Sequence, residues 1–267
     1  MISLLVLASL LAGSIAPVSA AEWNGRFSIW RNSAFATQYW DYSCVGATIQ
    51  IMLNLIHGRS DESRNRQDEY LDFAQAESRY EVTDQGADPE GWAQAMVRYD
   101  GGDDYGWAAA PTAQESLWVA ARQMRETEKP VGLLVHLGRH AWVMTGFEST
   151  ADPALTDDFE VTAAEVVGPL WPHGTLNGTS FDPGPRTWMD IRTLSRKFDT
   201  YAEPGQEVWQ GRYVTIIPKA SEANQGTNGP GGPGTSDAPD LNSAFGWAWA
   251  LRSLAAQGAV RDLIWLR

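Results

Sequence analysis

The residues of this 267-residue chain that can do chemistry gather around its single cysteine, Cys44. Apolar residues recur at helical spacing from Cys44 to Ile56, so we expect the thiol in the first turn of a buried helix. A thiol at a helix N-terminus meets the positive end of the helix dipole and unpaired backbone N–H groups. Both stabilise the thiolate, which is the nucleophilic form of cysteine. The position of Cys44 therefore predicts a reactive thiol.

Gln38 precedes the cysteine by six residues on the incoming loop. Its side-chain amide can point back at the helix start, where it and the backbone N–H of Cys44 can stabilise a developing oxyanion. We expect Gln38 to be this oxyanion donor. A capping or solvent-facing role is the alternative for a loop glutamine.

Four histidines are candidates for the base that a nucleophilic thiol needs: His57, His136, His140 and His173. His57 lies at the far end of the same helix, roughly 19 Å from Cys44 at about 1.5 Å per residue. His173 follows a proline in a loop, and His136 lies within a predicted strand. His140 follows a tight turn and opens the next strand, where it can meet the helix of Cys44. We therefore predict that His140 is the base.

The order of the predicted elements places these residues in one fold. Helices are predicted over residues 44–56, 63–76, 90–99 and 112–127, with Asp41 or Ser43 capping the first, and strands over 131–137, 141–147, 159–167 and 211–218. Helices followed by strands indicate an α+β class, with the N-terminal helices packed on one face of an antiparallel sheet.

The two ends of the chain differ from its middle in composition. Residues 1–20 combine an apolar stretch with the small residues of Val18-Ser19-Ala20, which predicts a secretory signal peptide and a secreted or periplasmic protein. An uncleaved anchor is the alternative. Residues 220–240 are rich in Gly and Pro and predict a linker. Residues 241–267 predict an apolar helix that docks on the main domain or binds a partner; its charges make a membrane span unlikely.

Charge and composition exclude several classes of function. The chain has 20 basic and 33 acidic residues, a net charge of −13, which disfavours nucleic-acid binding because phosphates require cationic partners. A single cysteine cannot form an internal disulfide or a zinc site of two or four cysteines. Neither a phosphate-binding loop nor a metal-ligand spacing occurs, so we expect no cofactor and no metal.

Three segments of the sequence resemble the papain-like cysteine peptidases. They are Gln38–Cys44, the strand pair Lys129–Phe147 that carries a Gly-x-His motif, and the closing strand Gly211–Ile217. The bacterial branch related to the bacteriocin-processing (double-glycine) peptidases is the most similar. The resemblance extends from Phe27 to Pro218.

The resemblance implies a papain-like cysteine proteinase fold in a domain over residues 21–219. It also implies roles: Cys44 as nucleophile, His140 as general base and then acid, and Gln38 as oxyanion donor. The family usually places an aspartate after the strand that follows the histidine strand, but Gly168 occupies that position here. The candidates to orient the imidazole instead are Glu165, Asp157, Asp158 and Asp182.

The expected function is an exported cysteine hydrolase that cleaves peptide or isopeptide bonds in a peptide or protein substrate. Two alternatives remain open at this stage. Gly168 can mark lost catalysis, which leaves a papain-like module that binds a cell-wall peptide or glycan. An acyltransferase would use the same catalytic residues, because the outcome depends on whether water or an amine reaches the acyl-enzyme.

Overall fold

The computed structural model describes residues 23–80, 86–102, 105–173 and 182–219. The predicted signal peptide, linker and C-terminal helix lie outside these ranges, so the predicted compartment and the role of the tail stay predictions. Within the described ranges, no helix has the length and apolar character needed to cross a membrane.

The described chain is a mixed α+β structure with one seven-stranded sheet, in which every strand pairing is antiparallel. This confirms the predicted α+β class. The helices are η1 (Asn32–Ala34, a 3-10 turn), α1 (Cys44–His57), α2 (Arg64–Ala76), α3 (Pro89–Asp100), α4 (Ala113–Thr127) and α5 (Ile191–Leu194). The strands are β1 (Arg26–Ser28), β2 (Tyr105–Ala110), β3 (Val131–Val135), β4 (His140–Ser149), β5 (Val161–Val167), β6 (Thr187–Asp190) and β7 (Tyr213–Pro218).

Strands that are distant in sequence are neighbours in this sheet. The order is β2-β7-β3-β4-β5-β6, and β1 pairs with β4 beyond the end of β3. The closing strand β7 therefore lies between β2 and β3. The central strands β3 and β4 form a hairpin in which Val135 pairs with His140, so the histidine begins its strand next to a short connection.

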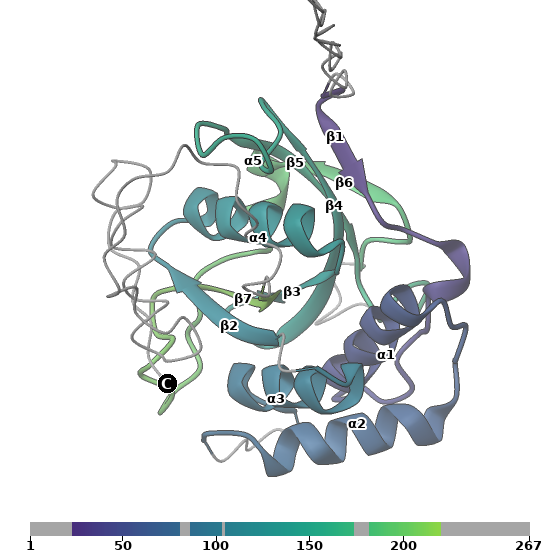
Figure 1. Ribbon diagram of the computed structural model, residues 1–267. Helices are drawn as coiled ribbons and strands as arrows, with labels where there is room; N and C mark the ends of the chain where they lie inside the picture. The colour runs from purple at the N-terminus through teal and green to yellow at the C-terminus, as the bar shows by residue number, and fades with distance from the viewer. Residues whose placement is uncertain (1–22, 81–85, 103–104, 174–181, 220–267) are drawn as a thin grey trace, which may run out of the picture.

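Helices cover both faces of the sheet, whereas the sequence predicted cover on one face. Helices α1, α2 and α3 lie on one side and α4 lies on the other (Figure 1). Successive residues of β4 show the reason: Ala141 and Val143 join the core under α1 and α3, and Trp142 and Met144 join the core under α4. A strand that is apolar at successive positions needs cover on both faces, so the expectation was wrong for α4.

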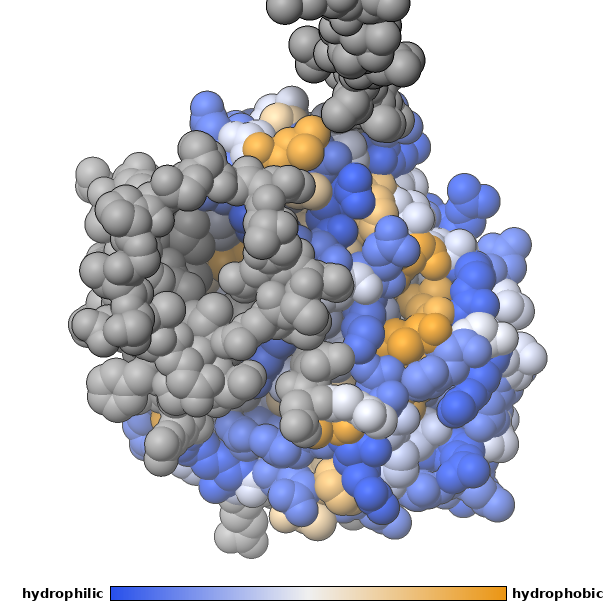
Figure 2. All heavy atoms as spheres, viewed as in Figure 1, coloured by the Kyte–Doolittle hydropathy of each residue, from blue (hydrophilic) through white to orange (hydrophobic). Residues whose placement is uncertain are grey.

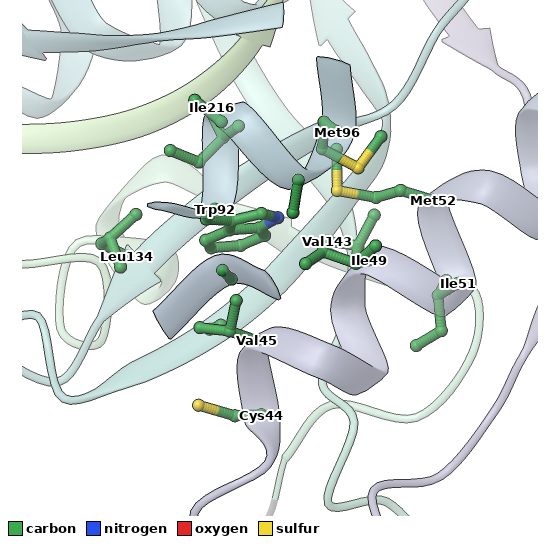
Figure 3. Close-up of a cluster of buried hydrophobic side chains, with 14 of the residues drawn as sticks. Cys44, Val45, Ile49, Ile51, Met52, Trp92, Met96, Leu134, Val143 and Ile216 are labelled. Atoms are coloured by element: carbon green, nitrogen blue, oxygen red, sulfur yellow. The ribbon is translucent and has the colours of Figure 1, made fainter. Parts of the chain in front are cut away.

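The larger core lies between the sheet and the first three helices. Figure 3 shows part of it, where Val45 and Ile49 of α1 pack near Trp92 of α3 and Val143 of β4. In the view of Figure 2, the described surface is mainly hydrophilic, with apolar residues in small patches. Because the apolar residues of α1 belong to the core against the sheet, this packing fixes the helix that carries Cys44.

Candidate active site

Cys44 is the first residue of α1, as the apolar spacing predicted. The following residues of the helix are buried up to Leu55, so the helix start is held rigidly. The Cys44 side chain is 8% exposed and lies at the edge of the buried cluster (Figure 3). The thiol is thus partly shielded but reaches the protein surface.

The first turn of α1 has no side-chain cap. Ser43 occupies the N-cap position, but its hydroxyl donates to the carbonyl oxygen of Trp40 at 3.0 Å and accepts the backbone N–H of Trp40. The expectation that Asp41 or Ser43 caps the helix was therefore wrong. The first N–H groups of a helix lack partners within the helix. Those around Cys44 consequently remain available to a ligand at the thiol.

His140 is the first residue of β4 and is only 2% exposed. The turn before it contains Gly138 at a φ of +89°, and a Cβ atom at that position would lie 2.4 Å from the ring of Tyr201. The backbone of this turn therefore packs directly on an aromatic ring, which only glycine permits. This packing fixes where the imidazole enters the site.

The His140 imidazole lies between Asp182 and Cys44. Its Nε2 atom is 2.9 Å and 3.0 Å from the two carboxylate oxygens of Asp182. Cys44 lines the same cleft as His140 and is close enough to the imidazole to raise its pKa. Because Nε2 faces the carboxylate, Nδ1 is the nitrogen left for the thiol.

Asp182 is itself held by two further donors. The indole Nε1 of Trp142 donates to Oδ1 at 2.9 Å, and the backbone N–H of Leu170 donates to Oδ2 at 2.7 Å. Burial raises the pKa of Asp182, but the hydrogen bond and positive charge of His140, together with these donors, outweigh burial and lower it. The carboxylate is therefore ionised at neutral pH.

The same contacts favour a charged imidazole. Burial lowers the pKa of His140, but the hydrogen bonds and negative charges of Asp182 and Cys44 outweigh burial and raise it to about 9. The neighbouring His136 has the opposite shift, because burial and the charge of His140 both lower its pKa. An imidazolium at His140 is the charge that stabilises an adjacent thiolate.

Asp182 occupies the space that a side chain at position 168 would need. A Cβ atom placed on Gly168 would lie 2.3 Å from Cγ of Asp182. The glycine that departs from the pattern of the resembling family thus makes room for a carboxylate from a later loop. The carboxylate reaches the imidazole from a different point in the chain.

The other sequence candidates for orienting the imidazole lie elsewhere. Buried Glu165 accepts hydrogen bonds from Ser28 and Thr145, and Asp157 pairs with Arg122 on α4. Asp158 is exposed in the loop between β4 and β5. Among the four candidates named from the sequence, Asp182 is the one that contacts His140.

The remaining histidines take other places. His57 lies 3.3 Å from a carboxylate oxygen of Asp100 at the end of α3. The centroid of the His136 ring is 6.1 Å from that of the His140 ring, and the His136 ring packs edge to face on Trp142. His173 is exposed in a turn. Of the four, His140 is the histidine brought to Cys44.

Gln38 is buried in the loop that leads to α1. Its amide Nε2 donates to the carbonyl oxygen of Trp40 at 2.8 Å, and its backbone N–H donates to Pro169 at 2.8 Å. Its Oε1 atom is buried and has no hydrogen-bond partner among the described residues. The loop is thereby tied to the segment after β5, and one of the two amide hydrogens stays uncommitted.

A cleft of about 270 Å³ opens at the thiol and the imidazole. Its walls include Tyr42 on the α1 side, and Tyr201 and Gln206 on the sheet side. Arg139 at the rim pairs with Glu203 at 2.6 Å. The sulfur and the imidazole therefore share one opening to the surface.

No protein-family model matches the chain, and neither a curated protein nor a solved structure shows significant similarity to it. Within the described ranges, no group of three or more His, Cys, Asp or Glu side chains is arranged to hold a metal ion.

Proposed function

We propose that this protein is a cysteine hydrolase with a papain-like fold that cleaves peptide or isopeptide bonds. The observation that carries the proposal is the arrangement of Cys44 and His140 at one cleft, with Asp182 hydrogen-bonded to the far side of the imidazole. A helix that presents a thiol at its N-terminus, packed against a sheet that presents a histidine, supports the fold assignment. The apolar N-terminal sequence supports export.

The proposed reaction begins with attack of the Cys44 thiolate on the carbonyl carbon of the substrate. A carbon–sulfur bond forms, and the carbonyl oxygen becomes an oxyanion that the backbone N–H of Cys44 and the free amide hydrogen of Gln38 stabilise. His140 then donates its Nδ1 proton to the leaving amine as the carbon–nitrogen bond breaks. The product is a thioester and a free amine.

Water completes the cycle. His140, now neutral, accepts a proton from water as the oxygen attacks the thioester, and the sulfur leaves as the thiolate. Asp182 contacts no reacting atom in this scheme, so it acts as a positioning residue. It holds the ring so that Nδ1 faces the sulfur and stabilises the positive charge of the imidazolium.

The contact between Asp182 and His140 favours catalysis over the binding-module hypothesis. That hypothesis depended on Gly168 as a sign of a missing orienting group, and Asp182 supplies such a group from another loop. An acyltransferase would use the same residues. Turnover at increasing concentrations of a primary alkyl amine separates the two, since a transferase gives mainly the amide at amine concentrations at which a hydrolase still gives mainly the carboxylate.

The pH dependence of Cys44 alkylation tests the proposal without a known substrate. In the full chain, we expect iodoacetamide to modify Cys44 well below pH 8, because an ion pair with His140 keeps the thiolate populated. In His140→Ala, the rate should instead follow an ordinary thiol with a pKa of about 8.5. Identical profiles for the two proteins, both centred near that ordinary value, would contradict the proposal.

A further inference from the structure

A second hollow adjoins the catalytic cleft. It measures about 440 Å³ and lies between the loop before Cys44 and helix α2. Tyr42 lines both this hollow and the catalytic cleft, so its side chain forms a wall that the two spaces share. A chain bound across Cys44 can therefore place one of its side chains in the second hollow.

The wall of the second hollow already holds a cation. Trp40 and Tyr42 stack with an interplanar angle of 4° and ring centroids 6.3 Å apart. The guanidinium carbon of Arg64 lies 4.0 Å from the centroid of Trp40. Tyr42 is 37% exposed, so part of the platform is open to a ligand. Aromatic faces attract cations through the ring quadrupole, and this wall shows that geometry with its own arginine.

The charge balance of the two spaces leaves carboxylates in excess. Arg64 pairs with Asp68 at 3.5 Å in the second hollow, and Arg139 pairs with Glu203 in the cleft. Each cation on these walls is thus matched by a carboxylate.

Two further carboxylates have no such match. Asp72 in the second hollow and Asp41 in the cleft have no ion-pair or hydrogen-bond partner for their side chains among the described residues. The net charge of −13 for the whole chain adds to the negative potential at these sites. An anionic substrate would be repelled by this arrangement.

We propose that the substrate carries a lysine or arginine side chain that enters the second hollow, lies against Tyr42 and donates hydrogen bonds to Asp72. Asp41 adds attraction at the entrance to the cleft. The inference rests on the proposed hydrolase function, which supplies the bond that is cut, and adds the chemical class of the residue that is recognised. An aromatic wall with an unpaired carboxylate suits a cation better than an aliphatic or neutral polar side chain.

Matched electrophilic probes test the substrate class. The probes are peptides that carry an epoxysuccinyl group, with the peptide extending from either side of the epoxide. At each peptide position, one probe carries arginine and its matched partner carries citrulline, the uncharged isostere of arginine. The readout is the second-order rate of Cys44 modification in the full chain, measured by intact mass. At one peptide position, we expect the probe with arginine to modify Cys44 about tenfold faster than the probe with citrulline at low salt. This difference in rate should shrink at high salt.

Variants locate the charge effect. Asp72→Asn should bring the ratio of the arginine rate to the citrulline rate close to one, and Asp41→Asn should reduce this ratio in part. Asp158→Asn removes an exposed carboxylate that lines neither space, and should keep the full preference. Equal rates for arginine and citrulline at every position, or a preference that survives in Asp72→Asn, would overturn the inference.

The reaction with iodoacetamide separates failure of the inference from failure of the proposed function. If Cys44 of the wild-type protein reacts below pH 8 but shows no preference for arginine, the hydrolase proposal stands and the cationic substrate is wrong. If Cys44 is unreactive to iodoacetamide and to every probe at that pH, both are overturned.

Discussion

Asp182 favours a positive charge on the imidazole that faces Cys44. It is ionised, nearly buried and bonded through both oxygens to Nε2 of His140. An ionised partner favours the protonated ring, and a neutral amide of the same shape does not. The carboxylate therefore matters through its charge as well as through its geometry.

Replacing this carboxylate by an amide should lower the pKa of His140. In Asp182→Asn, the negative charge is lost, so the ring should titrate at a lower pH than the value of about 9 in the wild type. A shift of about one unit or more is expected for a charge at this distance. Titration of the ring by NMR measures it. Asp158→Asn, which removes an exposed carboxylate in another loop, serves as the control; unchanged titration in Asp182→Asn would refute the argument.

The sequence singles out Cys44 and His140 as a candidate pair, whereas Asp182 was only one of four candidates to orient the imidazole. Cys44 and His140 carry local signals, namely a helix start and a Gly-x-His turn before a strand. Asp182 carries no local signal, because its closeness to His140 depends on how a loop 42 residues later folds back. The glycine at position 168 was the indirect clue, because it marks a place where another group approaches.

Helix α1, which begins at Cys44, makes an unusually close contact with α2. A Cβ atom on Gly46 would lie 2.4 Å from the backbone oxygen of Gln67. Gln67 also donates from Nε2 to Thr37 and to Gln50, so it links α2 to the loop before the cysteine and to α1. The close approach of the two helices therefore contributes to the stability of the fold and to the position of the loop before Cys44.

Adding one methyl group at this contact should destabilise the protein. Gly46→Ala forces α1 and α2 apart, and overpacking of this kind typically costs about 1–3 kcal/mol in the free energy of unfolding. Urea unfolding measures the change. Gly106→Ala is the matched control, because the atoms near its Cβ belong to the flexible end of Lys219. Equal midpoints for the two variants would contradict the packing argument.

Helices α1 to α4 and strands β3, β4, β5 and β7 were predictable, whereas strands β1, β2 and β6 were not. Helices α1 to α4 follow from apolar spacing and local signals such as the Thr112 cap, which accepts the backbone N–H of Glu115. Strands β1 and β6 have three and four residues, too few to show a period. Strand β2 reads Tyr-Gly-Trp-Ala-Ala-Ala, which lacks the β-branched residues typical of strands. Its place in the sheet comes from pairing with β7.

The buried ion pair of His140 and Asp182 makes the free energy of unfolding of the protein depend on pH. The pKa of His140 is raised, so its contribution is fully present below its ordinary value of about 6.5 and is lost as the pH rises through about 9. The pKa of Asp182 is lowered, so its contribution is present above about 4 and is lost as the pH falls further. The pair therefore stabilises the fold most between about pH 4 and 6.5.

Comparison of wild type and Asp182→Asn across pH tests this coupling. The difference in the free energy of unfolding should be greatest between about pH 4 and 6.5, on the order of 1–3 kcal/mol, and should shrink toward pH 9 and below pH 4. Denaturant unfolding at a series of pH values measures it. A difference that is constant with pH would show that the pair does not titrate as described.

The space shared by Gly168 and Asp182 also limits the order in which this sequence can change. A single Gly168→Asp substitution forces a second carboxylate into a volume that Asp182 already fills. A single Asp182→Gly substitution leaves the imidazole without its anion. The two arrangements of the carboxylate are thus separated by an impaired intermediate, and only a simultaneous exchange at both positions avoids it. The imidazole therefore keeps a carboxylate partner only if positions 168 and 182 change together.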